Sequence, residues 1–101
     1  MLETSTNEPF VTGKVKLVHA AGMHARPAVK LTKLAKRFQA QISVRASEAA
    51  EWINAKSVAK VMAMRAPRDS MIEIKAHGED AEAAVAALVQ LIVGDFPDQG
   101  M

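Results

Sequence analysis

Residues 22–28, which read Gly-Met-His-Ala-Arg-Pro-Ala, bring together side chains that can hold a phosphoryl group. The imidazole of His24 offers a nucleophilic nitrogen, and the guanidinium of Arg26 is a permanently charged planar fork that suits phosphate oxygens. Pro27 suits the first position of a helix, because proline lacks an N–H group and its φ is already helical. A helix beginning here would add unpaired backbone N–H groups and the positive end of its dipole. The segment is therefore a candidate phosphohistidine site; the alternative is a surface histidine beside a solvated arginine.

A second motif, Asn54-Ala55-Lys56-Ser57, stands immediately before a short apolar helical pattern. A serine that opens a helix can cap backbone N–H groups two or three residues on. Together the two motifs resemble the HPr family, the histidine-containing phosphocarriers of the phosphoenolpyruvate-dependent sugar phosphotransferase system. The resemblance covers roughly residues 14–94. Met23 replaces the usual leucine of the family loop Gly-Leu-His-Ala/Thr-Arg-Pro-Ala, a volume-conserving change.

The resemblance implies a function and a set of partners. Phospho-enzyme I would pass a phosphoryl group to the δ1 nitrogen of His24, Arg26 would steady its oxygens, and an enzyme IIA would receive it. Ser57 would be a regulatory site for an HPr kinase/phosphorylase. The chain would be a monomeric bacterial phosphocarrier without a cofactor, and no enzyme. The partners would dock on a surface beside the loop that comprises Ala25, Lys30, Lys56, Val58, Lys60, Val61, Met62 and Arg65.

Three further positions depart from the family pattern. Ala20 and Ala21 precede the loop where many relatives have larger or polar residues, so no side chain there can orient the imidazole. Arg65 stands where relatives often have a glycine, so the end of the second helix is expected to differ. These departures bear on the choice of partner more than on phosphorylation.

Composition excludes several other classes of protein. A chain of 101 residues, half hydrophobic and a quarter charged, fits one soluble domain. It has no cysteine, so a disulfide framework or thiolate metal site is excluded, and its three histidines lack a metal-ligand spacing. We expect His19 and His77 to be structural or exposed. No apolar run approaches the ~18 residues of a membrane span, and the N-terminus does not resemble a secretory signal. The sequence thus predicts a cytoplasmic protein without membrane insertion, and it contains neither a P-loop nor a nucleophile elbow.

Charge is distributed unevenly along the chain. Residues 14–68 contain twelve Lys or Arg and two acidic residues, whereas the rest contains one Lys and nine acidic residues. A concentrated basic surface attracts anionic partners over a distance. The basic stretch has few aromatic residues and no motif for reading RNA or DNA, so an acidic protein face is expected rather than nucleic acid. The alternative is a set of solvated, lysine-rich helix faces.

Periodicity predicts strands near residues 14–17, 42–46, 51–54 and 72–75, and helices over 27–38, 57–64 and 79–93. This order, βαββαβα, indicates a two-layer α+β open-faced sandwich. The family resemblance adds an antiparallel four-stranded sheet in the order 1-4-2-3 covered by three helices. We expect a flexible extension over residues 1–12, a phosphocarrier domain over 13–96 and a flexible tail over 97–101.

Other interpretations stay open. A regulatory module would use the phosphorylation state of His24 or Ser57 to control a kinase, sensor or transcription regulator, without sugar transport. An ACT-like domain would show a similar run of elements and would bind an amino acid. The second helix is apolar on most sides, so Val58, Val61 and Met62 could all pack into the core instead of docking a partner.

Overall fold

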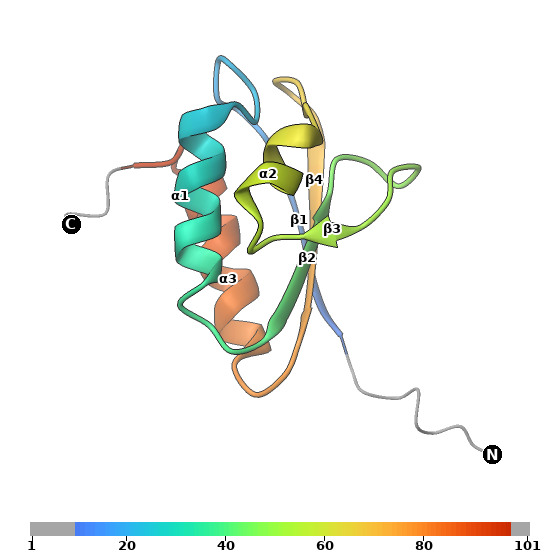
Figure 1. The fold of residues 1–101 in the computed structure, drawn as a ribbon, viewed down its shortest axis with the longest axis vertical. Coiled ribbons are helices and arrows are strands. Elements are labelled where there is room, and N and C mark those ends of the chain that lie inside the picture. Colours follow the sequence, from blue (N-terminus) through green and yellow to red (C-terminus); the bar gives the residue numbers. More distant parts are fainter. Residues whose placement is uncertain (1–9, 98–101) are drawn as a thin grey trace.

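Strands with one apolar and one polar face build the sheet in the computed structural model, which describes residues 10–97 (Figure 1). The strands are β1 (Val11–Lys16), β2 (Gln41–Arg45), β3 (Ile53–Asn54) and β4 (Met71–His77). All pairings are antiparallel, and the spatial order is β1-β4-β2-β3. The predicted order 1-4-2-3 is therefore confirmed.

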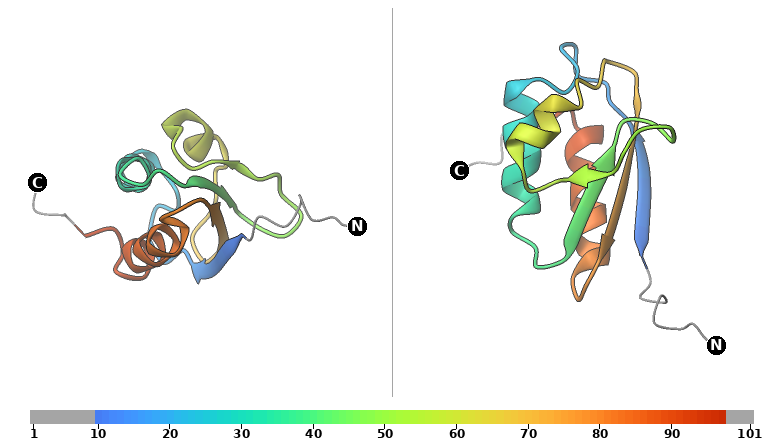
Figure 2. Two further views of the ribbon diagram at one scale, coloured as in Figure 1. Left: turned by 90° about the horizontal axis from the view of Figure 1, so that it is seen from below. Right: turned by 45° about the vertical axis from the view of Figure 1, so that its right-hand side comes forward.

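Three helices lie on one face of this sheet and leave the other face open (Figure 2). They are α1 (Ala25–Ala35), α2 (Val58–Ala63) and α3 (Ala81–Val93). The inward side chains of the strands, among them Val44, Ile72 and Ile74, meet Leu31 of α1 and Leu88 of α3, and none of these five exposes any surface. Burying a side chain of this size stabilises the fold by roughly 1.5–3 kcal/mol. The predicted two-layer sandwich is confirmed.

The observed elements differ from the predicted ones mainly at their ends. Helix α1 begins at Ala25 and ends at Ala35, so Pro27 occupies the third helical position instead of the first. Proline is tolerated there because the first-turn N–H groups have no intrahelical acceptor. Strand β3 contains only Ile53 and Asn54, two residues fewer than predicted. Trp52 lies outside it, and its ring contacts the charged groups of Arg45 on β2 and Lys75 on β4.

Charged side chains pair across the open face of the sheet. The guanidinium of Arg45 on β2 donates to the carboxylate of Glu73 on β4 at 2.8 Å, and the ammonium of Lys14 on β1 lies 3.6 Å from the same carboxylate. These cations, Arg45 first, lower the pKa of Glu73 below its usual value. The Arg45 guanidinium and the Lys75 ammonium also lie 4.3 and 4.5 Å from the Trp52 ring centroid. Much of the basic charge on this face is thus internally paired.

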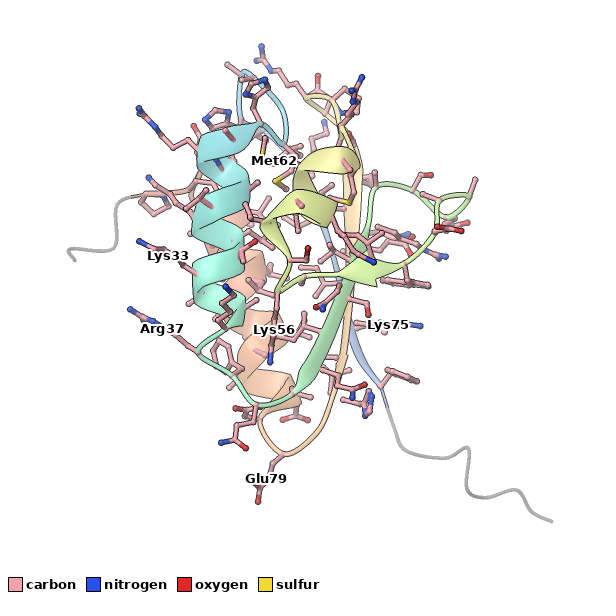
Figure 3. The ribbon with its side chains drawn as sticks, in the orientation of Figure 1. Lys33, Arg37, Lys56, Met62, Lys75 and Glu79 are labelled. Carbon is pink, nitrogen blue, oxygen red and sulfur yellow. The ribbon has the colours of Figure 1, made fainter. Side chains whose placement is uncertain are left out.

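Hydrogen bonds from the loop between α1 and β2 to a carboxylate join that loop to the start of α3. Asp80, which precedes α3, accepts hydrogen bonds from the backbone N–H groups of Gln39 and Ala40 at 2.9 and 2.8 Å. These bonds lower the pKa of Asp80 below its ordinary value, and the nearby charge of Lys56 contributes to the same shift. The Lys56 ammonium itself donates to the Phe38 carbonyl at 2.6 Å. Figure 3 shows Lys56 toward the end of α1 that is remote from the loop after β1.

The predicted terminal segments fall mostly outside the described residues, since residues 1–9 and 98–101 are not among them. Strand β1 starts at Val11, so the last two residues of the predicted extension belong to the sheet. No helix within residues 10–97 is both long enough and apolar enough to cross a membrane.

Candidate functional site

His24 is the residue from which α1 begins. Its backbone is extended, with φ −96° and ψ −168°, and its carbonyl accepts the first helical hydrogen bond from the Ala28 N–H at 2.9 Å. The side chain is exposed and makes no capping bond to the helix. The imidazole is therefore free for chemistry and stands at the positive end of a helix of eleven residues.

The first turn of α1 leaves two amide groups for an anion. The His24 N–H donates to Gly22 and the Ala28 N–H donates to His24, while Pro27 has none. The N–H groups of Ala25 and Arg26 therefore remain at the start of the helix, and no side chain among the described residues caps them. Arg26 is exposed and lies one helical position beyond Ala25, so its guanidinium can reach the same space. These groups together match a phosphoryl group held on His24.

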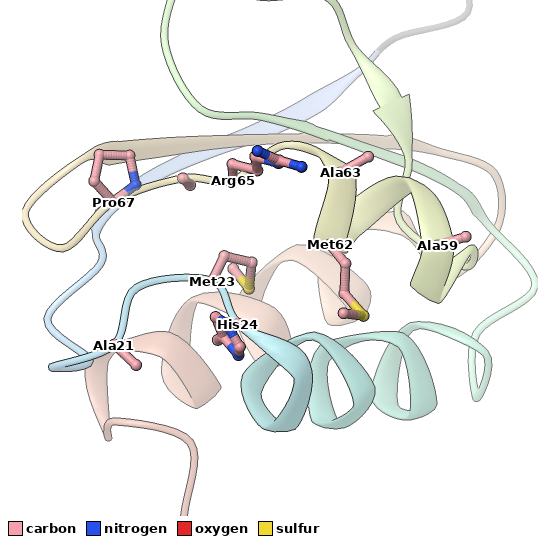
Figure 4. A pocket seen from close by; sticks show the side chains of 9 residues that line it. Ala21, Met23, His24, Ala59, Met62, Ala63, Arg65 and Pro67 are labelled. Carbon is pink, nitrogen blue, oxygen red and sulfur yellow. The ribbon is translucent and has the colours of Figure 1, made fainter.

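The His24 loop and the end of α2 enclose a groove of about 770 Å³ (Figure 4). Ala21, Met23 and His24 line one side, and residues of α2 and the following loop line the other. The members from α2 and its loop are Ala59, Met62, Ala63, Arg65, Ala66 and Pro67. Apart from His24 and Arg65, the lining side chains are apolar, so no other charged side chain lines the groove.

A glycine allows the two sides of this groove to meet. Gly22 has φ +72°, and a Cβ at this position would lie 2.5 Å from the carbonyl oxygen of Ala66. That same oxygen accepts a hydrogen bond from the Met23 N–H at 2.8 Å, while the Met23 side chain is buried. Only glycine combines this backbone conformation with so close an approach. The bond places His24, the next residue, against the loop that follows α2.

The apolar part of the predicted docking surface is only partly exposed. Val58 and Met62 are 38% and 39% exposed, and Ala25 is exposed as well. Val61 exposes nothing and belongs to the core, so its predicted docking role is wrong. Val61 is the buried residue of α2, and the other positions of this helix are exposed. Sequence reasoning missed Val29, which is 42% exposed and lies four residues after Ala25 on the same face of α1.

The basic residues of the predicted docking surface also divide into two groups. Lys60 and Arg65 are exposed on α2 and just after it. The ammonium of Lys30 instead donates to the Phe96 carbonyl at 2.8 Å, beyond the end of α3, and that of Lys56 is bonded at the far end of α1. Both of these lysines are only partly exposed and hold the fold together. Figure 3 shows Lys33 of α1 and Arg37, just after it, toward the end of α1 that is remote from the His24 loop, and neither lines the groove.

Ser57 caps α2 as the sequence predicts. Its hydroxyl oxygen accepts a hydrogen bond from the Lys60 N–H at 3.2 Å, and its carbonyl accepts one from the Val61 N–H at 2.9 Å. Such a cap is worth roughly 0.5–2 kcal/mol. Asn54 supports the turn before it, since its side-chain oxygen accepts from the Lys56 N–H at 2.9 Å. Ser57 lies at the start of α2 and does not line the groove, whereas Ala59, Met62 and Ala63 of the same helix do.

The other two histidines make structural contacts. The Nδ1 atom of His19 accepts from the Ala21 N–H at 3.2 Å, and its ring packs edge-on against Phe96. His77 pairs through Nε2 with the Gln41 side chain at 2.9 Å. No group of three or more potential metal ligands occurs within residues 10–97. His24 is the one histidine of the three that lines the groove.

Comparison with known proteins identifies the family. The family model "PTS-HPr: PTS HPr component phosphorylation site" matches residues 11–93. The chain belongs to the HPr family. The phosphocarrier protein HPr of Treponema pallidum (strain Nichols) is 35% identical over 90 residues, which cover 89% of this chain and all of that protein. The phosphocarrier protein NPr of Escherichia coli (strain K12) is 34% identical over 84 residues, which cover 83% of this chain and 92% of that protein.

Solved structures agree with this assignment. The crystal structure of HPr-C-His from Thermoanaerobacter tengcongensis superposes with a TM-score of 0.80 at 30% identity, covering 88% of this chain and 98% of that chain. The resemblance inferred from the two motifs is therefore confirmed, and this HPr-family chain is a phosphocarrier component of the phosphotransferase system. HPr and NPr are nearly equally similar to it, and both names describe a phosphocarrier.

Proposed function

We propose that His24 accepts a phosphoryl group from phospho-enzyme I and passes it to an enzyme IIA. The observation that carries this proposal is the placement of an exposed imidazole at the start of α1, beside two available amides and Arg26. The His24 ring also faces a groove with no carboxylate in its lining, so no negatively charged side chain of the lining repels a phosphate dianion there. A helix N-terminus and an arginine both favour bound phosphate.

In the proposed reaction the δ1 nitrogen of His24 attacks phosphorus in line. The bond from phosphorus to enzyme I breaks as the bond to the His24 nitrogen forms, and the electron pair leaves with the enzyme I side chain. The amides of Ala25 and Arg26 and the Arg26 guanidinium stabilise the equatorial oxygens of the transferring group. The second transfer repeats this step with His24 as the donor. Because the carrier must release both partners, a modest docking surface suits the task.

The docking surface proposed for these partners comprises Ala25, Val29, Val58 and Met62 at its centre, with Lys60 and Arg65 as basic members. Its apolar members are exposed on α1 and α2, two helices that pack side by side. Exposed methionine adapts to surfaces of different shape, which suits a protein with successive partners. The basic members favour an acidic partner face.

Replacement of the histidines one at a time tests the acceptor. After incubation with enzyme I and phosphoenolpyruvate, His24→Ala should show no acid-labile gain of one phosphate by mass spectrometry. His19→Asn and His77→Gln keep polar atoms near the hydrogen bonds seen here and should be phosphorylated like the wild type. Peptide mapping that locates the phosphate on His19 or His77 would disprove the assignment.

We further propose that Ser57 is a regulatory phosphorylation site for an HPr kinase/phosphorylase. A phosphate there adds about −1.5 to −2 charges beside Lys60 and would repel an acidic enzyme I. Ser57→Asp should retain a near-normal melting temperature and slow phosphorylation of His24 about tenfold, equivalent to ~1.4 kcal/mol. Ser57→Ala should lose the cap and some stability, with little change in transfer. A Ser57→Asp protein that transfers at the wild-type rate would leave Ser57 as a helix cap only.

A further inference from the structure

Arg65 adopts a left-handed backbone conformation that is unfavourable for most residues with a Cβ. It follows α2 directly, its N–H donates to the Met62 carbonyl at 3.1 Å, and its φ is +51°. Helices usually end in this left-handed conformation with glycine. Because glycine would adopt it without strain, an arginine here is best explained by what its side chain does. Strained residues of this kind gather at functional sites.

The Arg65 side chain lines the same groove as His24, on the opposite wall (Figure 4). It is exposed, and within residues 10–97 its guanidinium has no ion-pair or hydrogen-bond partner. The lining between the two residues consists of alanine, methionine and proline side chains. An uncompensated guanidinium between apolar walls is suited to an anion and has none among the described groups of the protein.

Backbone hydrogen bonding fixes the two walls relative to each other. The Met23 N–H donates to the Ala66 carbonyl at 2.8 Å, and these two residues are the immediate neighbours of His24 and Arg65. The Cα atoms of His24 and Arg65 are thus held on either side of one hydrogen bond.

We propose that Arg65 is a second phosphate-binding residue, whose guanidinium donates hydrogen bonds to the phosphoryl oxygens on His24 from the wall opposite α1. This inference rests on the proposed phosphorylation of His24. It predicts that Arg65 stabilises the phosphorylated carrier itself, and not only the complex with a partner. A guanidinium pairs with phosphate in a planar, bidentate way that lysine cannot reproduce.

The test compares Arg65→Gly, Arg65→Lys and Arg68→Ala with the wild type. Arg68 is a matched control, since it is an exposed arginine of the same loop that does not line the groove. Arg65→Gly should fold at least as stably as the wild type, because glycine accepts a φ of +51°. Two quantities are measured: the equilibrium constant for phosphoryl exchange with enzyme I, and the second pKa of the phosphate on His24, followed by phosphorus NMR. The resonance is assigned by its absence from His24→Ala.

We expect Arg65→Gly to shift the exchange equilibrium about tenfold toward enzyme I and to raise the phosphate pKa, because the dianion loses a guanidinium. Arg65→Lys should recover part of both effects, and Arg68→Ala should match the wild type. A residue that acts only in docking would change the rate of exchange and leave both equilibrium quantities unchanged, which would overturn the inference. If wild-type His24 takes up no phosphoryl group at all, the proposed function fails and this inference fails with it. The wild-type sample alone distinguishes that outcome from a failure of the Arg65 inference.

Discussion

Gly22→Ala should disrupt the candidate site through a single added methyl group. The φ of +72° places residue 22 in the left-handed region, which costs a residue with a Cβ roughly 1–2 kcal/mol. The new Cβ would also lie 2.5 Å from the Ala66 oxygen, the acceptor of the Met23 N–H. Relieving that contact moves the acceptor away and loses a hydrogen bond worth about 1 kcal/mol. The total loss is about 3 kcal/mol.

Urea denaturation gives the change in the free energy of unfolding, and single-turnover phosphorylation by enzyme I gives the effect on the site. For a domain of this size, ~3 kcal/mol corresponds to a fall in Tm of about 12–24 °C. Phosphorylation measured well below the new Tm should slow about tenfold or more, since the imidazole is displaced from the groove. A misplacement of ~1 Å can lower a reaction rate on the order of 100-fold.

Two further variants separate the cost of the left-handed backbone conformation from the cost of the close contact made by the added Cβ. Gly22→Asn tolerates the left-handed conformation but still brings a Cβ against the Ala66 oxygen, so it should lose less stability than Gly22→Ala and still be slow in transfer. Gly94→Ala is the control, because Gly94 has an ordinary φ of −80° and its Cβ would approach no atom closer than 3.2 Å. If Gly22→Ala unfolds at the same urea concentration as Gly94→Ala, the close approach does not hold the groove together.

Three other predictions concern stability and docking. Asp80→Asn should be less stable than the wild type at neutral pH. Folding lowers the pKa of Asp80, so the contribution of its carboxylate to the free energy of unfolding is fully present above the unfolded pKa of 3.8 and is lost as the pH falls through the folded pKa. Melting curves of the two proteins should therefore converge in acid. Val61→Ala should cost about 2–3 kcal/mol in urea denaturation, whereas the exposed Val58→Ala should cost less than ~0.5 kcal/mol, and equal losses would contradict the burial seen here. Lys60→Glu should slow phosphorylation by enzyme I and weaken its salt dependence at an unchanged Tm, whereas Lys56→Glu should lower the Tm, as a salt series with thermal melts would show.

Patterns that repeat along the chain predicted most of the fold. Alternation located β1, β2 and β4, and the stripe of small and aliphatic residues in α3 located that helix to within two residues. The start of α1 was placed two residues late, because proline marks the first turn of a helix without specifying the position within it. Strand β3 was predicted two residues too long, since Glu51 and Trp52 precede Ile53 directly but do not pair with β2.

Positions that depend on long-range contacts could not be predicted in this way. Helix α2 is short and apolar on most sides, so periodicity did not distinguish the buried Val61 from the exposed Val58 and Met62. The hydrogen bonds of Asp80 with Gln39 and Ala40 join residues about forty positions apart. The sequence does not indicate which distant amide groups will donate hydrogen bonds to an aspartate such as Asp80. The motif located His24, Arg26 and Ser57, whereas the structure was needed to show which lysines remain available to a partner.

The candidate site is held together by the backbone, and this leaves its side chains available to the proposed phosphoryl group and partners. The Leu17 N–H donates to Ser70 at 2.8 Å, the Asp69 N–H donates to Leu17 at 2.7 Å, and the Met23 N–H donates to Ala66 at 2.8 Å. These three bonds join the loop after β1 to the loop after α2 without using a side chain. A carrier that meets different partners in turn needs such an arrangement, because side chains that held the loops together could not also rearrange between one partner and the next.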